Sequence, residues 1–290
     1  MKDTATDTAG MGYLQSVPHR AVTVWLPLSV FLFVLLFPFY WMVVTTLKPN
    51  EELLSREGNP FWVKNPTFAH IHKLLFDTAY PDWLWNTMLV SVTSTLLSLL
   101  CSVLAAYSIE RLRFRGSRYV GMAIFLAYLV PPSILFIPLA IMVFNFGLYD
   151  SPLALILTYP TFLIPFATWL LIGYFKSIPY ELEECALIDG ATRLQILWKI
   201  TLPLAIPGLI SAAIFAFTLS WNEFIYALAF IQSAERKTVP VAVLTQLVEG
   251  DVYHWGSLMA GALLGSIPVA IFYSFFVEHY VSSLTGAVKE

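Results

Sequence analysis

The chain has 290 residues, of which 58% are hydrophobic, 16% aromatic and 12% charged, and its mean hydropathy is +0.72. A soluble domain carries about 25% charged residues, so this chain has too little polar surface to cover a water-soluble particle of its size. The formal net charge of −3 is too small to indicate nucleic-acid binding. Long uncharged stretches between short charged clusters are typical of a polytopic membrane protein.

A polar leader over residues 1–21 comes first. No cleavable signal peptide is expected, because the apolar run that follows exceeds the roughly 7–15 residues of a signal-peptide core. Six segments have the roughly 20 apolar residues of a membrane-crossing helix, whereas barrel strands would be shorter and alternating. The expected fold class is therefore all-α, with six transmembrane helices. These are roughly Val22–Leu47, Trp85–Ile109, Val120–Phe144, Leu153–Tyr174, Leu204–Phe230 and Leu258–Val277, giving a transmembrane domain over 22–277 and a tail over 278–290.

The distribution of Lys and Arg predicts that both termini face the cytoplasm. With the N-terminus inside, ten of these residues fall in cytoplasmic segments and six in outer ones. The short loop Glu110–Tyr119 alone holds four arginines, and short basic loops of this kind stay on the cytoplasmic side. The outer loops are then Lys48–Leu84 and Ile231–Ser257.

Both outer loops are rich in proline and aromatic residues. Aromatic side chains suit a membrane-interface belt, and they equally suit a docking surface for an extracytoplasmic partner. Tyr253, His254 and Trp255 are the candidate contacts in the second loop, although a lone loop histidine is commonly inert.

Prolines interrupt the third and fourth spans, where each removes a backbone donor and kinks the helix. They are Pro131, Pro132, Pro138, Pro160 and Pro165. Broken helices line the pathway in many transporters, and kinks are also ordinary in membrane helices. Pro131 and Pro132 are therefore pathway candidates, with simple kinking as the alternative.

The fifth span contains two polar residues that are further pathway candidates, Asn222 and Glu223. A carboxylate inside a hydrophobic span is costly and usually faces an interior or an aqueous cavity. Because Glu223 falls toward the outer end of the span, snorkelling to water explains it as well.

A polar loop, Phe175–Pro203, separates the fourth and fifth spans and predicts two short helices. Ser177 and Pro179 suit the start of the first, whose early glutamates face the positive end of the helix dipole, and Gly190 suits its end. A capping box at Thr192 starts the second, and Pro203 and Pro207 break the chain before the fifth span. The expected apolar side comprises Leu182, Cys185, Ala186, Leu194, Leu197 and Ile200, beside an acidic flank. Such a face fits a groove on another protein, and a self-packed surface loop is the alternative.

The spacing within this loop resembles the EAA loop of ABC importer permeases. That signature is Glu-Ala-Ala, three residues, Gly, nine residues and Ile-x-Leu-Pro. Here the matching positions are Glu184, Cys185, Ala186, Asp189-Gly190 and Ile200-Thr201-Leu202-Pro203, with Cys185 for the first Ala as the one departure. The six spans, the run Trp221–Phe224 and the ending Gly286–Lys289 are similar to the maltose-importer type of carbohydrate permease.

The resemblance implies a type I ABC importer permease fold, in which residues 177–203 form the EAA-like loop that docks on a separate ATPase. It implies as partners a second, related permease, two ATPase subunits, an extracytoplasmic sugar-binding protein and membrane lipid. ATP and Mg²⁺ would bind to the ATPase, with no cofactor or metal on this chain, which would not itself be an enzyme. The location implied is the cytoplasmic membrane of a bacterium or archaeon.

The resemblance also assigns roles within the loop. The ATPase-coupling candidates are Glu184, Cys185, Ala186, Asp189, Gly190, Ile200, Leu202 and Pro203. Glu184 is the expected charged contact, with a merely solvated side chain as the alternative, and Asp189 either caps the helix or makes a contact. Gly190 is expected to permit a sharp turn against the partner, so a bulky residue there should uncouple ATP hydrolysis from uptake.

Other interpretations fit less well. A secondary transporter needs coupling-ion acids or inverted repeats, and Glu223 is the one acid inside a predicted span. No predicted span contains a histidine for intramembrane hydrolysis, and the sequence has no phosphate-binding Gly-x-x-x-x-Gly-Lys-Ser/Thr loop. A permease for another small polar solute remains the main alternative, because this chain does not reveal which solute is carried.

Overall fold

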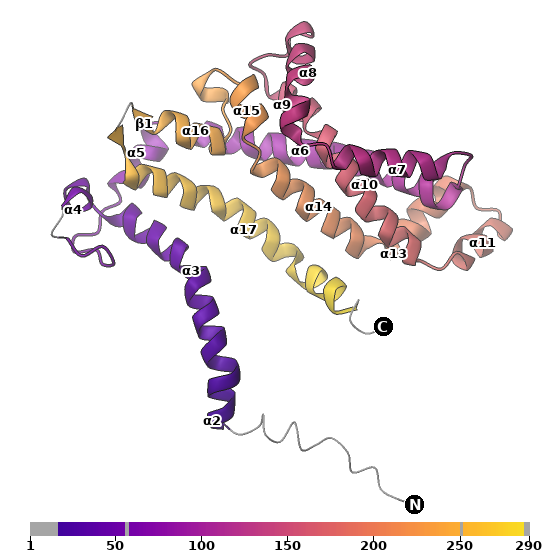
Figure 1. Ribbon diagram of the computed structural model, residues 1–290, viewed down its shortest axis with the longest axis horizontal. Helices are drawn as coiled ribbons and strands as arrows, with labels where there is room; N and C mark the ends of the chain where they lie inside the picture. The colour runs from indigo at the N-terminus through magenta and orange to yellow at the C-terminus, as the bar shows by residue number, and fades with distance from the viewer. Residues whose placement is uncertain (1–16, 56–57, 250–251, 287–290) are drawn as a thin grey trace, which may run out of the picture.

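A computed structural model describes residues 17–55, 58–249 and 252–286 (Figure 1). Most of the described residues are helical. The order is α2 (Val17–Arg20), η1 (Ala21–Trp25), α3 (Leu26–Leu47), α4 (Asn50–Leu54), α5 (Ala69–Phe76), α6 (Tyr80–Tyr107), η2 (Ser108–Leu112), α7 (Ser117–Tyr128), α8 (Pro132–Asn145), α9 (Pro152–Thr158), α10 (Pro160–Ser177), α11 (Glu181–Ile188), α12 (Arg193–Ile196), η3 (Leu197–Thr201), α13 (Leu202–Leu204), α14 (Ile206–Trp221), α15 (Ile225–Phe230), η4 (Ala234–Arg236), α16 (Val239–Gln246), β1 (Val248–Glu249), β2 (Val252–Tyr253) and α17 (Trp255–Gly286). Most of the expected leader and the end of the expected tail, residues 1–16 and 287–290, lie outside the described residues.

Four of the described helical stretches are long and apolar enough to cross a membrane singly. They are Ala21–Leu47, Tyr80–Leu112, Pro152–Ser177 and Trp255–Phe276. Two bent pairs bring the number of candidate spans to six if each pair is one span: Ser117–Tyr128 with Pro132–Asn145, and Arg193–Leu204 with Ile206–Trp221. The all-α polytopic class is therefore confirmed, with two spans that are broken rather than continuous.

The third expected span, Val120–Phe144, is wrong as a single helix, because α7 and α8 meet at an angle of 96°. Pro131 has an extended backbone, with ψ of 134°, and Pro132 takes the first position of α8. A residue before proline is disfavoured in the helical region, so the two consecutive prolines end one helix and start another. Pro165, by contrast, lies inside α10 without ending it.

The fifth expected span, Leu204–Phe230, is also wrong as a single helix. The chain turns at Ala205, beyond Pro203, and α13 and α14 belong to segments that meet at 79°. A second break at Asn222–Phe224 separates α14 from α15. Pro203 therefore lies within the helical segment Arg193–Leu204 without breaking it, and the chain turns two residues later.

The bundle is organised around α6, α10 and α14, which all contact one another. The buried face of α6 is made largely of small hydroxyl residues, Ser91, Ser94, Ser98 and Ser102 among them. Small residues at helix interfaces let backbones approach closely in a membrane, where apolar burial gives little driving force between helices. The α17 helix packs on α14 and on α3 (Figure 1).

The first span stands apart from this bundle, as Figure 1 shows for α3. Its large apolar side chains are mostly exposed from Val22 to Tyr40, and only Val44, Thr45 and Thr46 near its end are buried. A helix that is apolar on all sides is typical of a membrane span. The chain itself therefore leaves most of this helix for lipid or another protein to cover.

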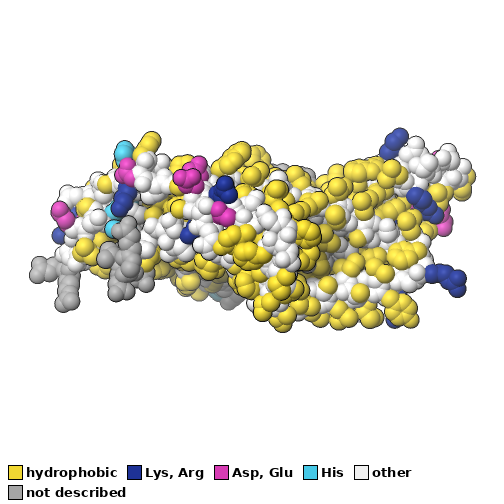
Figure 2. Space-filling model, turned by 90° about the horizontal axis from the view of Figure 1, so that it is seen from above, with side chains coloured by type: hydrophobic (Ala, Val, Ile, Leu, Met, Phe, Trp, Pro, Cys, Tyr) yellow, Lys and Arg dark blue, Asp and Glu magenta, His cyan; other side chains and the backbone are white. Residues whose placement is uncertain are grey.

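Charged side chains gather toward the two ends of the bundle in the view from above (Figure 2). Lys and Arg stand out at the end that holds α11, the loop end, and hydrophobic side chains cover much of the middle. Acidic, basic and histidine side chains gather toward the other end, the hairpin end, where β1 pairs antiparallel with β2. This arrangement fits a protein whose middle lies in hydrocarbon.

A close contact between α10 and α14 gives a test of the bundle packing. A Cβ atom at Gly208 would overlap the ring of Tyr174, whereas a Cβ atom at Gly173 would have no neighbour within 4 Å. We expect Gly208→Ala to destabilise the bundle by about 1–3 kcal/mol through overpacking. The check is the melting temperature of the purified protein, with Gly173→Ala as the matched control. Equal melting temperatures for the two variants would contradict this packing.

Candidate functional site

The EAA-like loop folds by local hydrogen bonds into two helical segments, as expected. The Thr192 hydroxyl accepts from the Gln195 amide at 3.3 Å, and the Gln195 side chain accepts from the Thr192 amide at 2.8 Å. This reciprocal pair is the predicted capping box. The second segment continues through η3 and α13, so it is longer than expected.

The first segment, α11, ends at the predicted glycine. Gly190 has φ of +83°, its amide donates to Leu187 O at 3.0 Å, and the Ala191 amide donates to Ala186 O at 2.9 Å. These two bonds form a Schellman motif, which satisfies carbonyls at a helix end and favours glycine in the left-handed region. The start differs from the expectation, since Tyr180 is the N-cap and makes no side-chain capping bond.

Glu183 is fully buried. Its position among the early glutamates of the loop predicted instead an exposed side chain on the acidic flank. Its Oε1 accepts from the Thr201 hydroxyl at 3.0 Å and lies 3.3 Å from the Nε of Arg111. Its Oε2 lies 3.5 Å from the Tyr107 hydroxyl and 3.9 Å from Nη1 of Arg193. One carboxylate therefore contacts α6, η2, α12 and η3.

Arg111 is buried as well, with 3% of its side chain exposed. Its Nη2 donates to the carbonyls of Phe175 and Ile178 at the end of α10, the second at 2.7 Å. The last carbonyls of a helix lack partners within it and carry its negative pole, so a cation is favourable there. Nε makes no well-aligned hydrogen bond, so its contact with Glu183 is ionic. The guanidinium also lies 5.5 Å from the ring centre of Tyr180.

The predicted coupling residues divide between the surface and the interior. Glu184, Cys185, Asp189, Gly190 and Pro203 are exposed, Ala186 and Ile200 are half-buried, and Leu202 is buried. Leu197, expected on the outward apolar side, is buried in the core below the loop. The apolar side chains that do face outward are Leu182, Ile188, Leu194 and Trp198, with exposed fractions from 43% to 85%. The loop therefore presents a small apolar surface with Glu184 and Asp189 on the same element.

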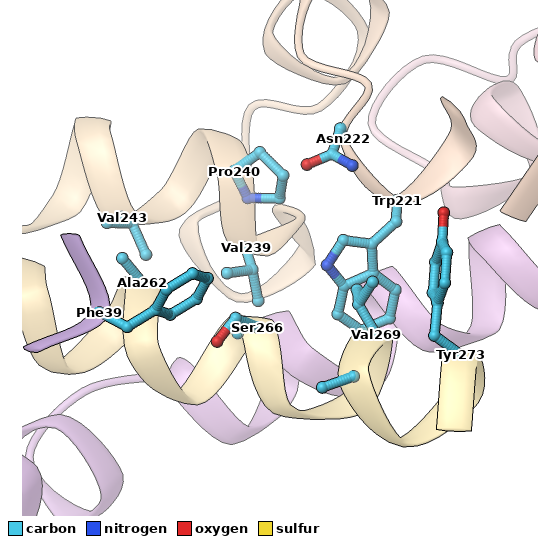
Figure 3. A pocket seen from close by; sticks show the side chains of 12 residues that line it. Phe39, Trp221, Asn222, Val239, Pro240, Val243, Ala262, Ser266, Val269 and Tyr273 are labelled. Carbon is cyan, nitrogen blue, oxygen red and sulfur yellow. The ribbon is translucent and has the colours of Figure 1, made fainter. Parts of the chain in front are cut away.

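A pocket of about 480 Å³ lies where α14 reaches its break (Figure 3). Phe39, Trp221 and Tyr273 supply aromatic surface, with Val239, Pro240, Val243, Ala262, Val269 and Ala270 among the other lining residues. Asn222 and Ser266 add polar groups, and the Tyr273 hydroxyl lies 2.8 Å from that of Thr218. An aromatic, mostly apolar pocket with a few polar groups suits a small organic molecule. Asn222, one of the pathway candidates, therefore lines a pocket.

Glu223, the second candidate, serves the helix break. Its carboxylate accepts from the amides of Tyr226 and Ala227 at 2.8 and 3.0 Å and from the Tyr159 hydroxyl at 2.9 Å. The side chain therefore caps α15 and faces the protein, which favours the interior interpretation over snorkelling. The Tyr226 hydroxyl donates to Pro132 O at 2.8 Å, so the two helix breaks touch. Pro131 and Pro132 are exposed and line no described pocket.

A second, more polar cavity of about 260 Å³ lies at the hairpin end. His254 lines it, together with Lys73, Asp77, Thr78, Trp83, Gln246 and Ser257. Trp255 is 50% exposed beside it. Tyr253 belongs to β2, and its side chain is not among those described. Two of the three predicted partner contacts therefore lie at one rim.

Asp150 lies outside the spans, in the connection between α8 and α9. It binds the segment that follows α15 through Gln232 and Ser233. Burial raises the pKa of its carboxyl, but hydrogen bonds from Ser233 and Gln232 and the charge of Arg236 outweigh burial and leave the pKa below its usual range. The carboxylate accepts from both backbone amides at 2.9 Å. Among the described residues, no group of three or more His, Cys, Asp or Glu is placed to hold a metal ion.

Sequence reasoning missed the buried charge cluster below the loop. In the sequence, Arg111 is one of four arginines that indicate orientation, and Glu183 is one of three neighbouring glutamates. The available signal was spacing, because Tyr107 and Arg111 lie four apart at the end of a span and so share a face. Their partner on the other side of the loop could not be inferred from sequence.

Bent candidate spans, an open pocket between helices and an exposed helical loop fit a polytopic transport protein. The family described as "Binding-protein-dependent transport system inner membrane component" matches residues 98–286, which include the EAA-like loop and the last span. The chain belongs to this family, and it is a permease component of such a system.

Known relatives agree with this assignment over the whole length. The inner membrane ABC transporter permease protein YcjP of Escherichia coli is 36% identical over 90% of this chain and 94% of its own. The sulfoquinovosyl glycerol transport system permease protein SmoH of Agrobacterium fabrum is 34% identical, with both chains fully covered. In structure, a chain of a bacterial ABC transporter that imports the acidic polysaccharide alginate matches with a TM-score of 0.79 and 23% identity, over 91% of this chain and 98% of that one. This likeness confirms the fold.

The left-handed Gly190 offers a test of the loop. Gly190→Val should strain the backbone, because β-branched side chains avoid positive φ, whereas Gly190→Asn should be tolerated since asparagine enters that region more readily. We expect the valine variant to insert in the membrane and to lose most substrate uptake. The check is uptake at matched membrane levels; equal uptake by the two variants would contradict a conformational role.

Proposed function

We propose that this chain is one of two related permease subunits of an ATP-driven importer for a sugar or oligosaccharide. Support comes from the family match, from relatives named for carbohydrate transport, and from an aromatic pocket with polar groups at the break in α14. Aromatic faces and a few hydrogen-bonding groups suit a sugar. The observation that carries the proposal is the exposed EAA-like loop, with its apolar surface and Glu184.

In this proposal the EAA-like loop docks on a separate ATPase, one of two copies in the complex. The exposed Leu182, Ile188 and Leu194 would enter a groove on that subunit, and Glu184 would meet a basic group there. ATP and Mg²⁺ would be bound by the ATPase, so this chain would perform no catalysis itself. ATP binding would bias the transporter between two states, and the loop would carry that bias to the spans.

The loop end would face the cytoplasm, together with both termini. Lys and Arg side chains stand out at that end in Figure 2, as the positive-inside rule requires. The described transmembrane domain would then extend over residues 22–277 between a cytoplasmic leader and tail. The hairpin end would face outward, where Trp255 and the cavity lined by His254 would meet a sugar-binding protein, with Tyr253 beside them.

The docking proposal is tested by charge reversal at the loop surface. Glu184→Lys should reduce the ATPase that co-purifies with the complex by about tenfold, since a like-charge contact at an interface costs several kcal/mol. Glu181→Lys, an exposed position in the first turn of the same helix, is the matched control. The measurement is the ratio of ATPase to permease after purification. A wild-type complex that retains no ATP-hydrolysing subunit would refute the permease role itself.

The pathway proposal is tested at Asn222. Asn222→Leu should lower uptake of labelled disaccharides by roughly tenfold or more, because the sugar hydroxyl that Asn222 would bind in the pocket loses its hydrogen-bond partner. The retained ATPase should not change. Asn145→Leu, at an exposed position that does not line the pocket, serves as the control. Uptake of an amino acid but of no sugar by the wild-type complex would favour a permease for another polar solute.

A further inference from the structure

The buried cluster below the EAA-like loop is centred on Glu183, whose carboxylate lies against Arg111 and Thr201. Glu183 has no exposed surface, although the neighbouring Glu184 and the nearby Glu181 are exposed. A buried carboxylate is costly unless it is paired and hydrogen-bonded. Glu183 therefore cannot touch a docked partner directly, and its contacts are all internal to this chain.

Those contacts join segments that are far apart in sequence. Thr201 approaches from η3, the segment that leads into α14, and Tyr107 from the end of α6. Arg111, directly after α6, links the same carboxylate to the terminal carbonyls of α10. The three spans connected in this way are the three that pack together in the bundle.

Stability alone does not account for such a pair. Replacing a buried ion pair by apolar residues is often neutral or stabilising, and removing one partner alone is strongly destabilising. What a paired charge does fix is geometry, because neither group can shift without leaving the other unpaired. The guanidinium adds directionality, since its Nη2 donates to the carbonyls of Phe175 and Ile178 while its Nε faces the Glu183 carboxylate.

We propose that Glu183 and Arg111 form a strut that transmits the movement of the docked EAA-like loop to the packed spans α6, α10 and α14, the last of which lines the pocket at Trp221. The inference rests on the proposed ATPase docking and deepens it. Both are positioning residues, which touch neither nucleotide nor substrate. With the strut intact, α11 and η3 move as one body with the ends of α6 and α10. Without the strut, the loop still moves with the docked ATPase, but the accessibility of the pocket beside Asn222 does not change.

The test measures how nucleotide changes access to the pocket. The complete transporter, with its second permease and ATPase, is placed in lipid nanodiscs with Asn222→Cys and with Cys101 and Cys185 replaced. A water-soluble maleimide is the probe, and its labelling rate is compared without nucleotide and with ATP, Mg²⁺ and vanadate. We expect a change of about fivefold or more in this parent, the lower range of typical allosteric coupling.

Three changes then remove the strut. Glu183→Gln removes the negative charge at nearly constant shape, and Arg111→Lys keeps the positive charge but loses the fork. The double change Arg111→Met with Glu183→Met leaves no unpaired buried charge, so it should accumulate in the membrane. Glu183→Gln leaves the Arg111 charge without its counter-ion and should lower the amount of protein in the membrane, so the double change is the decisive variant. The double change and Arg111→Lys should retain the bound ATPase and basal ATP hydrolysis, with the labelling change reduced to below about twofold, which is less than typical allosteric coupling. Glu181→Gln and Arg113→Met, exposed neighbours of the two residues, should keep the parent response.

Several outcomes overturn the proposal. One is a parent-like labelling change in the double variant. Another is loss of the ATPase from the strut variants to the same extent as from Glu184→Lys, which would make the cluster part of docking. Failure of the double variant to accumulate, while the controls do, would show that the pair holds the fold instead. A parent without any response to nucleotide would refute the proposed function, and not the strut specifically.

Discussion

The constraint on which the structure depends is that backbone groups inside hydrocarbon must find partners within the protein. Two spans of this chain are broken, and each break frees amides or carbonyls that lipid cannot satisfy. The carboxylate of Glu223 accepts from two free amides of α15, and the Tyr226 hydroxyl reaches the carbonyl of Pro132 at the other break. The break before α8 and the break before α15 thus lie against each other, beside the core that Tyr159 and Tyr226 help to form.

The need to pair backbone groups also explains the charged cluster at the loop end of the bundle. There α10 stops below the EAA-like loop, and its last carbonyls are met by Arg111. A side chain that satisfies a helix end needs its own counter-charge when it is buried, and Glu183 provides it. Glu223 and Arg111 each pair backbone groups that a helix end leaves free, and Glu183 neutralises Arg111. The pocket beside Asn222 lies at the end of α14, next to the break that Glu223 caps.

Sequence reasoning succeeded where the controlling physics is local. The apolar spans, the capping box at Thr192 and the left-handed Gly190 are each specified within a few neighbouring residues. It failed where partners are distant. The burial of Glu183 depends on Arg111, 72 positions earlier (183 minus 111). The 96° bend is an exception with a local cause, because two consecutive prolines, for which pathway lining or simple kinking was expected, end one helix and start another. Of the pathway candidates, Asn222 lines a pocket, whereas Glu223 has a helix-capping role and a Tyr159 partner that only the fold brings near.

The local hydrogen bonds of the EAA-like loop have a consequence for complex formation. Because the bonds of the Schellman turn and of the capping box are all made between residues of the loop itself, the loop has few alternative backbone states to lose on association. Ordering a flexible segment at an interface would oppose binding, and a preformed one avoids most of that entropy loss. Subunits that meet through such a surface can associate by rigid-body encounter, so the rate of assembly would be set by diffusion and orientation in the membrane and not by folding of the loop.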